Sequence, residues 1–253
     1  MEDDVLPPYA EELIEGEPNV PLDAPRERRT CIIEDVWDEG SRYIGLRVKV
    51  DGEFREAYTT PGQYVTLSPT HVDPRFLVIA NAPGEPSEHG WEFLVDRHTD
   101  LGESIDPLSS GETLEISAPE GPGYPVDDLA DARVICFVTG SGIASIRPVL
   151  QYWWENPEIA PADISLYYGE SNPGDHAYRS ESADWARKGV DIFHCNGSGA
   201  EEGYRYVQHA FEDDAPDLDE AVAFIAGAPV MKRAVVDLLV AEGLPIGRVV
   251  TNI

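Results

Sequence analysis

The first half of the chain alternates short apolar and polar positions in segments that are cut by turn residues. Between residues 30 and 118 no helical stretch separates most of these segments. Closely spaced runs with a two-residue period predict strands joined by tight connections, and so an antiparallel β-barrel. The segments are TCIIEDVW (30–37), RYIGLRVKVDG (42–52), QYVTLSP (63–69), RFLVIAN (75–81), WEFLVDR (91–97) and ETLEISA (112–118).

The pattern changes near residue 125, where apolar runs begin to alternate with amphipathic stretches. RVICFVTG, ISLYYGE, VDIFHCNG, AVAFIAGA and GRVVTNI predict strands, and each except the last is followed by a helical segment. Such alternation predicts a doubly wound α/β domain with a parallel sheet. We therefore expect an acidic tail at 1–27, a barrel domain at 28–125 and an α/β domain at 126–253, with PEGPGYPVDD (119–128) as the linker.

Composition narrows the classes of partner. The 253 residues carry a net charge of −30, which opposes binding to nucleic acid or to an anionic membrane surface. No apolar run reaches the roughly 18 residues of a membrane span. Lysine occurs only at Lys49, Lys188 and Lys232. Many carboxylates with few lysines favour a halophilic chain, although a merely acidic protein or one that docks on a basic partner stays open.

The cysteines argue for a reduced compartment. Cys31, Cys136 and Cys195 lie far apart, and none belongs to a C-x-x-C pair. This spacing indicates neither a disulfide framework nor a zinc site, and two of the three lie within apolar runs. We expect buried thiols, no metal and a cytoplasmic location.

Candidate chemistry gathers where the predicted parallel strands end. CFVTGSGIASIRPVL (136–150) joins a strand to a helix through Thr-Gly-Ser-Gly, and YYGESNPGDHAY and FIAGAPVM place glycine and proline at two further strand ends. A glycine turn that opens a helix aims free N–H groups at a phosphate. The complete G-x-G-x-x-G fingerprint is missing, so a plain strand-to-helix turn stays an alternative for the first loop.

These motifs, in this order, resemble the ferredoxin–NADP reductase-like flavoproteins over roughly residues 30–253. PGQYV, RFLVIANAP, LGESI and GETLEISAPEGPGY are similar to the flavin-domain motifs of the family. VTGSGIASIRPVL, YYGESNPGDHAY and FIAGAPVM are similar to its motifs G-T-G-I-A-P, Y-G-x-R-[ST]-P and C-G-P-x-x-M. A branch near a plant fruit-protein type has the same F-L-x-I-A strand.

The resemblance implies a barrel that holds FAD, in preference to FMN. It assigns Arg75 to the flavin phosphate, since a planar guanidinium suits a diphosphate. Leu77 and Val78 replace a tyrosine and a serine that contact the isoalloxazine ring. The remaining flavin positions that the resemblance implies are Ile79, Ala80 and Asn81 through their main chain, with Gly102 and Ser104 at a short helix that faces the pyrophosphate.

The resemblance also implies a dinucleotide site on the second domain. Ser171 stands where many relatives carry an arginine, and Glu170 precedes it, which favours NADH over NADPH. Ala226 replaces the family cysteine and Ala228 a proline. The positions implied to bind the dinucleotide are Thr139, Gly140, Gly142, Ile143, Tyr168, Gly227, Pro229 and Met231.

The leading hypothesis is an oxidoreductase that passes electrons from NAD(P)H through FAD to an acceptor, with a redox protein as one possible partner. No side chain is assigned a catalytic role, because the cofactors carry the chemistry. The substitutions at Leu77, Val78, Ala226 and Ala228 motivate an alternative, a non-catalytic binding or regulatory subunit. A third hypothesis is an electron-transfer subunit of a larger complex. The oligomeric state stays open.

Overall fold

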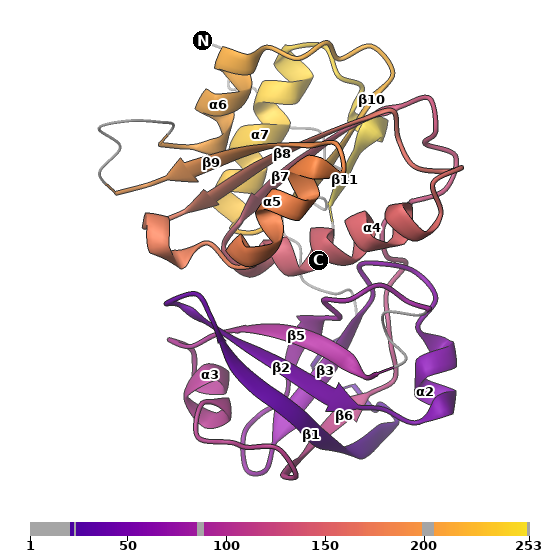
Figure 1. The fold of residues 1–253 in the computed structure, drawn as a ribbon, viewed down its shortest axis with the longest axis vertical. Helices are drawn as coiled ribbons and strands as arrows, with labels where there is room; N and C mark the ends of the chain where they lie inside the picture. The colour runs from indigo at the N-terminus through magenta and orange to yellow at the C-terminus, as the bar shows by residue number, and fades with distance from the viewer. Residues whose placement is uncertain (1–20, 23, 85–88, 199–204, 252–253) are drawn as a thin grey trace.

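The protein consists of two domains stacked along its long axis, with the α/β domain above the barrel in Figure 1. The structure, a computed structural model, describes residues 21–22, 24–84, 89–198 and 205–251. Most of the predicted acidic tail, residues 1–20 and 23, lies outside the described residues, so the prediction for it stays open.

The first domain is a six-stranded antiparallel sheet that curls into a barrel, as predicted. Its strands follow the order β4-β3-β6-β1-β2-β5. Alternating residues point inward and form an apolar core that includes Ile33, Leu46, Val65 and Phe93, each essentially without exposed surface. The strands are β1 (Arg28–Glu39), β2 (Tyr43–Lys49), β3 (Tyr64–Pro69), β4 (Arg75–Val78), β5 (Trp91–Asp96) and β6 (Thr113–Ser117).

Two short helices close the barrel. Helix α2 (Gly52–Ala57), which the sequence pattern did not predict, begins because the Asp51 side chain accepts a hydrogen bond from the Phe54 N–H at 3.0 Å. The Phe54 ring is buried and stacks on Trp91. Helix α3 (Asp100–Ile105) follows β5 and begins at Thr99, whose hydroxyl caps it in the same way.

The second domain is a parallel five-stranded sheet of order β11-β10-β7-β8-β9, which confirms the doubly wound prediction. Helices α4 and α5 cover one face of this sheet, and α6 and α7 cover the other. The strands are β7 (Arg133–Thr139), β8 (Asp163–Glu170), β9 (Val190–Asn196), β10 (Ala221–Ala226) and β11 (Val249–Thr251). The helices are α4 (Ile143–Glu155), α5 (Arg179–Arg187), α6 (Val207–Asp214) and α7 (Pro229–Ala241), with short 3-10 turns at Gly140–Gly142, Pro173–Asp175 and Ile246–Arg248.

One apolar cluster continues across the junction of the two domains. Tyr43, Ala80 and Leu94 of the barrel are buried together with side chains of α4 and the parallel sheet. The segment predicted as a linker also packs there, because Tyr124 stacks on Phe224 with ring centroids 4.6 Å apart. Burial of these groups holds the domains together, so the junction is a packed interface.

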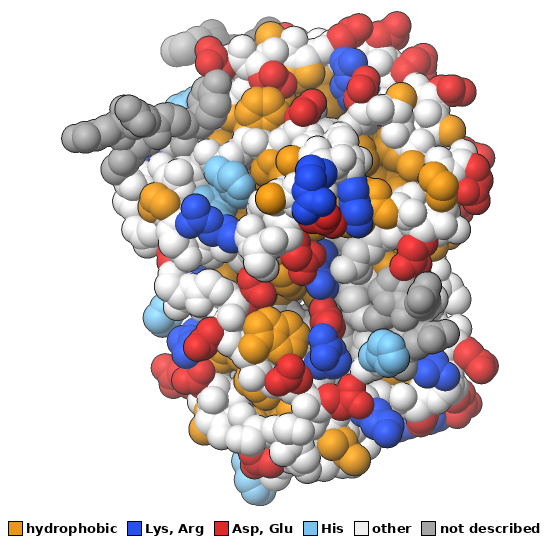
Figure 2. Space-filling model, viewed as in Figure 1, with side chains coloured by type: hydrophobic (Ala, Val, Ile, Leu, Met, Phe, Trp, Pro, Cys, Tyr) orange, Lys and Arg blue, Asp and Glu red, His pale blue; other side chains and the backbone are white. Residues whose placement is uncertain are grey.

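Acidic side chains lie at the surface of the protein and the cysteines in its interior, as the composition suggested. Acidic side chains are spread over both domains on the face that Figure 2 shows. All three cysteines are free and buried, and burial raises the pKa of the Cys31 thiol to about 11 and of the Cys136 thiol to about 12. Within the described part of the chain, every helix is too short or too polar to span a bilayer.

Candidate functional site

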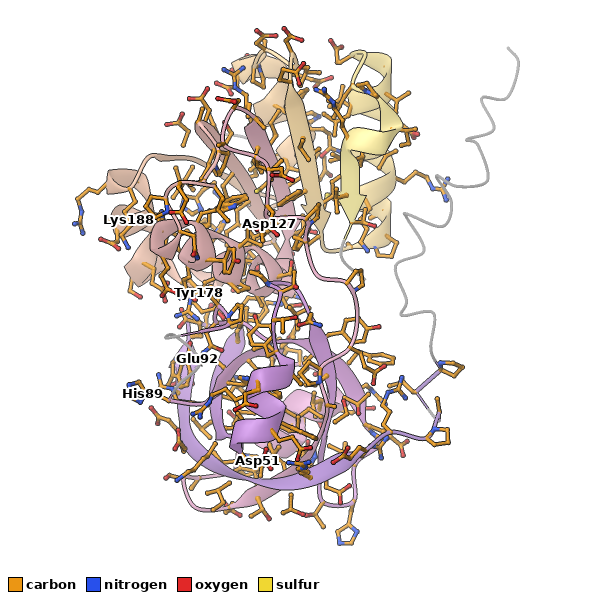
Figure 3. All side chains as sticks on the ribbon, turned by 90° about the vertical axis from the view of Figure 1, so that its right-hand side faces the viewer. Asp51, His89, Glu92, Asp127, Tyr178 and Lys188 are labelled. Carbon is orange, nitrogen blue, oxygen red and sulfur yellow. The ribbon has the colours of Figure 1, made fainter. Side chains whose placement is uncertain are left out.

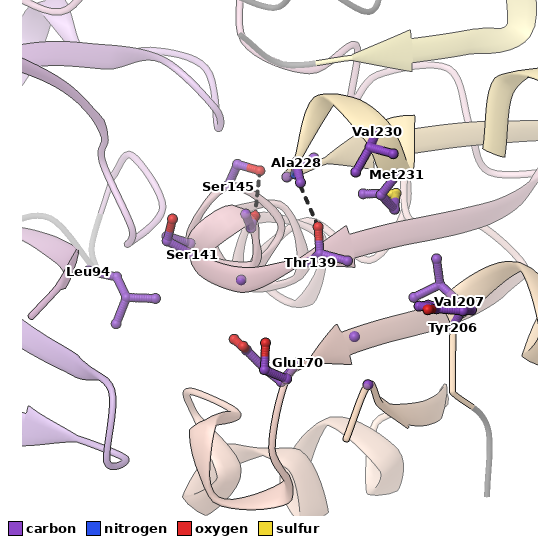
Figure 4. Close-up of a pocket in the computed structure, with 18 of the residues that line it drawn as sticks. Leu94, Thr139, Ser141, Ser145, Glu170, Tyr206, Val207, Ala228, Val230 and Met231 are labelled. Carbon is purple, nitrogen blue, oxygen red and sulfur yellow. Dashed lines mark hydrogen bonds between the residues drawn. The ribbon is translucent and has the colours of Figure 1, made fainter. Parts of the chain in front are cut away.

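A cavity of about 890 Å³ lies where the carboxyl edge of the parallel sheet meets the barrel. In open α/β sheets this edge is the usual place for a ligand. Figure 4 shows it from the side, with Leu94 of the barrel facing the turns of the second domain. Seven of the predicted site residues line it, namely Leu77, Val78, Thr139, Gly140, Gly142, Gly227 and Met231.

The barrel side of the cavity is formed by β4, an end strand of its sheet. Phe76, Leu77 and Val78 all line the cavity. The N–H group of Ile79 donates to the carbonyl oxygen of Gln63 at 3.1 Å, so it points toward β3. Because backbone groups alternate in direction along an antiparallel strand, the N–H and C=O of Val78 turn away from β3. The site therefore offers main-chain donors and acceptors where Val78 lacks a polar side chain.

Arg75 lies at the beginning of β4, outside the cavity itself, with 43% of its side chain exposed. Its guanidinium donates to the carbonyl of Pro74 at 3.2 Å and lies 3.9 Å from Asp100 Oδ2, in the first turn of α3. The fold thus brings Arg75 to the helix that the resemblance assigns to the same phosphate. A partly exposed guanidinium keeps donors available for an anion.

Gly102 and Ser104 form part of α3 and do not line the cavity. A Cβ atom on Gly102 would lie 2.2 Å from the carbonyl oxygen of Asp96, so close packing against the chain after β5 accounts for this glycine. Its N–H donates to the Thr99 hydroxyl at 3.1 Å, and the Ser104 hydroxyl donates to Leu101 at 2.7 Å. Both groups are used within the helix.

Ile79, Ala80 and Asn81 are buried behind the cavity wall. The Ala80 N–H donates to the carbonyl of Glu92 at 2.8 Å. The Asn81 side chain donates to Gly90 at 3.0 Å and accepts from the Glu92 N–H at 2.8 Å. These bonds tie the chain after β4 to β5, so the segment that the resemblance assigned to flavin contacts closes the barrel instead of lining the cavity.

The glycine turn after β7 is a 3-10 turn that leads directly into α4. Gly140 has φ +62°, a conformation that favours glycine. A Cβ on Gly142 would lie 2.6 Å from the carbonyl oxygen of Ala226, because the turn packs closely against the end of β10. Ile143, the first residue of α4, is buried and anchors the helix start.

The turn after β10 interlocks with the first. Gly227 has φ +132°, and a Cβ there would lie 2.3 Å from the Thr139 hydroxyl. The Ala228 N–H donates to that hydroxyl at 3.1 Å, as the dashed line in Figure 4 shows. Pro229 occupies the first turn of α7, where its missing N–H costs nothing, and Met231 reaches the cavity.

Glu170, at the end of β8, is a buried carboxylate that accepts hydrogen bonds from side chains of both domains. Glu170 lines the cavity and accepts hydrogen bonds from the Tyr43 hydroxyl at 2.5 Å and the Tyr168 hydroxyl at 3.1 Å. Arg42 of the barrel donates to it at 3.2 Å. Burial raises the pKa of Glu170, against the opposing effect of these partners. Tyr168 thus contacts Glu170 and does not itself line the cavity, so its predicted contact with the dinucleotide stays a prediction.

Sequence reasoning missed two groups at this site and a third at the domain junction. Arg205 and Tyr206 line the cavity at the beginning of α6, with the guanidinium 5.2 Å from the ring centroid. A basic residue just before a helix, in a chain with 18 basic against 48 acidic side chains, was the available signal. Arg147 lies within a quoted motif but received no role, although it donates to the Ala80 carbonyl at 2.8 Å and to Glu92 at 2.7 Å. It joins α4 to the barrel on the side away from the cavity.

Comparisons with known proteins agree with this architecture. Residues 136–237 match the family model of the oxidoreductase NAD-binding domain. The sulfhydrogenase 2 subunit gamma of Pyrococcus furiosus is 24% identical over 218 residues, which cover 79% of this chain and 74% of that protein.

Solved structures share the fold at low identity. The ferredoxin-NADP+ reductase of Plasmodium falciparum superposes with a TM-score of 0.76 at 15% identity, covering 89% of this chain and 96% of that one. A ferredoxin NADP+ reductase from Neisseria gonorrhoeae, solved with bound FAD and NADP, gives 0.75 at 14% identity over 90% and 98% of the two chains. The family resemblance of the sequence is confirmed. The chain carries an oxidoreductase NAD-binding domain within the two-domain fold of the ferredoxin–NADP reductase-like oxidoreductases.

Proposed function

We propose that this protein is a flavin-dependent oxidoreductase that takes electrons from a nicotinamide dinucleotide and passes them through FAD to an acceptor. The observation that carries the proposal is the cavity of about 890 Å³ between the domains. It is lined on one side by β4 and on the other by the glycine turns after β7 and β10. A ring bound on β4 and a dinucleotide laid along the sheet edge would therefore meet in one cavity.

The residues present are suited to a flavin diphosphate. Leu77 and Val78 offer an apolar surface for a flat ring, and the outward main-chain groups of β4 offer hydrogen bonds to its polar edge. Arg75 supplies a partly exposed guanidinium beside α3. Asp100 opposes an anion there, but its side chain is 89% exposed and is free to turn into solvent. When bound, FAD supplies the redox chemistry, and this chain binds and orients it.

We propose NADH as the electron donor. The carboxylate of Glu170 lies at the end of β8 beside the neutral Ser171, and Arg42 is already paired with Asp96 and Glu170. Arg205 is the cavity-lining cation that would be placed to meet a 2′-phosphate, and its substitution tests the preference directly.

A second candidate function differs in the electron acceptor: the protein would be the electron-transfer subunit of a larger complex. Its support is the similarity to a protein named as the gamma subunit of a sulfhydrogenase. At low ionic strength a chain of net charge −30 would attract a basic docking partner over a long range, whereas molar salt would screen that attraction to direct contacts. Rapid reduction of an artificial dye without turnover of any small natural acceptor is the expected behaviour of such a subunit.

The same charge supports adaptation to concentrated salt. The chain has 48 acidic and 18 basic side chains, so acidic groups repel one another. We infer that dissolved salt stabilises the fold by screening this repulsion. The midpoint of thermal unfolding is expected to rise as potassium chloride is added to molar concentration. A midpoint that falls or stays constant would contradict this inference.

FAD retention tests the proposed flavin site. Arg75→Ala is expected to weaken FAD binding roughly 10- to 100-fold, since a charge-assisted hydrogen bond contributes about 1.5–3 kcal/mol. Arg233→Ala, which removes an exposed arginine of α7, is the matched control and should leave FAD affinity unchanged. Equal affinity in the wild type and both variants would contradict the placement of the phosphate. A wild type that binds no flavin would favour the non-catalytic alternative.

A further inference from the structure

A cluster of four polar side chains crosses the domain junction on the side of the cavity. We call Arg42, Tyr43, Tyr168 and Glu170 the Glu170 cluster. Arg42 lies in the turn directly before β2 of the barrel, Tyr43 begins that strand, and Tyr168 and Glu170 lie at the end of β8 of the parallel sheet. Two phenolic hydroxyls and one guanidinium converge on a single carboxylate, at 2.5 Å, 3.1 Å and 3.2 Å.

Because this cluster is buried, its carboxylate needs hydrogen-bond donors from the protein itself. Only 1% of the Glu170 side chain is exposed, and Tyr43 has no exposed surface. A carboxylate removed from water loses its hydration and needs hydrogen bonds in return. The bond from Tyr43 is the short one, and it comes from the other domain. Separating the domains at this point would leave Glu170 without its closest donor, so the cluster opposes opening of the cavity.

The cluster also lies beside the glycine turn. A Cβ atom built on Gly140 would lie 3.5 Å from the Tyr43 hydroxyl oxygen. The Tyr43 hydroxyl is therefore next to the turn after β7 while it donates to Glu170 at the end of β8, and Arg42 and Glu170 line the cavity itself. Arg147 joins the domains on the opposite side of α4, against Glu92 and Glu181, and does not reach this cavity. The cavity side of the domain junction is therefore held by contacts of its own, those of the Glu170 cluster.

We propose that Glu170 is a positioning residue. By accepting from Tyr43 it fixes the glycine turn at a set distance from β4, so that a dinucleotide on the turn is held in reach of a flavin on the strand. This inference rests on the proposed function. It predicts an effect on the rate at which the dinucleotide reduces the flavin and little effect on the binding of either, because a displacement of about 1 Å lowers such a rate up to 100-fold.

Tyr43→Phe is the central test, because it removes one hydroxyl and keeps the ring. In anaerobic single-turnover mixing of the FAD-loaded protein with NADH, the limiting rate of flavin bleaching should fall at least roughly 10-fold. FAD occupancy, and the NADH concentration that gives half the limiting rate, should change less than about threefold. A fall in affinity with an unchanged limiting rate would overturn the proposal.

Tyr167→Phe is the matched control. The Tyr167 hydroxyl donates to Asp214 at 2.6 Å, a phenol–carboxylate bond of similar length that lies wholly within the second domain. Its loss is expected to leave the limiting rate within about twofold. Equal slowing in both variants would show a general loss of stability and would contradict a positioning role.

A double-mutant cycle tests the pairing. If Tyr43 acts through Glu170, the variant that carries both Tyr43→Phe and Glu170→Gln should be no slower than the slower single variant. Independent, multiplying losses would contradict the pairing of these two residues.

A flavin-independent measurement separates this inference from the proposed function. In the cofactor-free protein, the amides of residues 140–143 should exchange with solvent at least about 10-fold faster in Tyr43→Phe than in the wild type or Tyr167→Phe. Faster exchange in Tyr43→Phe, found together with a wild type whose flavin is never reduced, would disprove the oxidoreductase proposal and leave the structural role of the Glu170 cluster standing. If these amides exchange at the same rate in Tyr43→Phe and in the wild type, the Glu170 cluster does not hold the glycine turn, whatever the redox activity.

Discussion

Arg147 is the side chain whose removal should loosen the domain junction most. It comes from α4, only 11% of it is exposed, and its guanidinium lies 4.7 Å from the centroid of the Tyr178 ring. It donates to the Ala80 carbonyl at 2.8 Å, to Glu92 Oε2 at 2.7 Å, and to Glu181 at 2.9 Å. Figure 3 shows Glu92 and Tyr178 approaching each other from the two domains at this level.

The expected loss follows from what Arg147→Met leaves behind. Breaking a buried ion pair by removing one partner costs about 3–5 kcal/mol. Glu92 is 12% exposed and keeps Arg47, while Glu181 is 32% exposed and regains water, so the lower end of that range applies. We expect a loss of about 3 kcal/mol in the free energy of unfolding. For a chain of this size each kcal/mol lowers the midpoint temperature by about 2–4 °C, which gives roughly 6–12 °C.

The pH dependence gives a second signature of the same contact. Burial alone would raise the pKa of Glu92, but the charges of Arg147 and Arg47 hold it below its ordinary value. A carboxyl whose pKa is depressed in the folded state stabilises the fold above its unfolded pKa, and that stability is lost as the pH falls through the folded value. Without Arg147 the depression shrinks, so the acid-side loss of stability still begins near the unfolded pKa but is complete at a higher pH and is smaller in total.

Urea unfolding at fixed salt, with tryptophan fluorescence as the signal, measures both effects. Arg187→Met is the matched control, because Arg187 is 75% exposed and pairs only across one helical turn with Asp184 at 3.1 Å. It should cost less than about 0.5 kcal/mol. If Arg147→Met costs no more than Arg187→Met, the junction does not depend on this arginine and the reasoning is wrong.

Three further predictions concern the cavity. Gly227→Ala, which sets a Cβ against Thr139 at a strained φ, should cost at least about 2 kcal/mol in urea unfolding, whereas Gly247→Ala in open space should cost less than about 1 kcal/mol. Arg205→Ala should change kcat/KM for NADH and NADPH by less than about threefold each. A selective loss with NADPH would refute the NADH proposal. Because the folded pKa of Glu170 is raised, its contribution to stability is present below the unfolded pKa and is lost as the pH rises through the folded pKa. Glu170→Gln should abolish that decline, and a persistent decline would assign it to another group.

Local sequence signals predicted the fold well. The six barrel strands and five parallel strands lie where the apolar periodicity placed them, because each buries one or both faces in a core. Helix α2 was missed because six residues are too few to show a helical period, although Asp51 is a recognisable cap.

The site was predicted only where its determinants are local in sequence. The turn at Thr139–Gly142 is such a case, because a strand, two glycines and a helix follow one another directly. The Tyr43–Glu170 bond joins residues 127 positions apart, and the Arg147–Ala80 bond spans 67. Such pairs depend on how the domains pack, which no periodicity encodes. Asn81 shows the same limit, since the resemblance implied a main-chain contact with flavin, whereas the fold buries this residue and bonds its side chain to Gly90 and Glu92.

The central claim is that flavin and dinucleotide meet in the cavity between β4 and the glycine turns. The most direct test is anaerobic titration of the purified, FAD-loaded protein with NADH in concentrated salt, followed by visible absorbance. We expect each chain to retain one FAD and NADH to bleach it completely. A protein that binds FAD but keeps its full absorbance in excess NADH and NADPH would show that the two cofactors do not meet in this cavity.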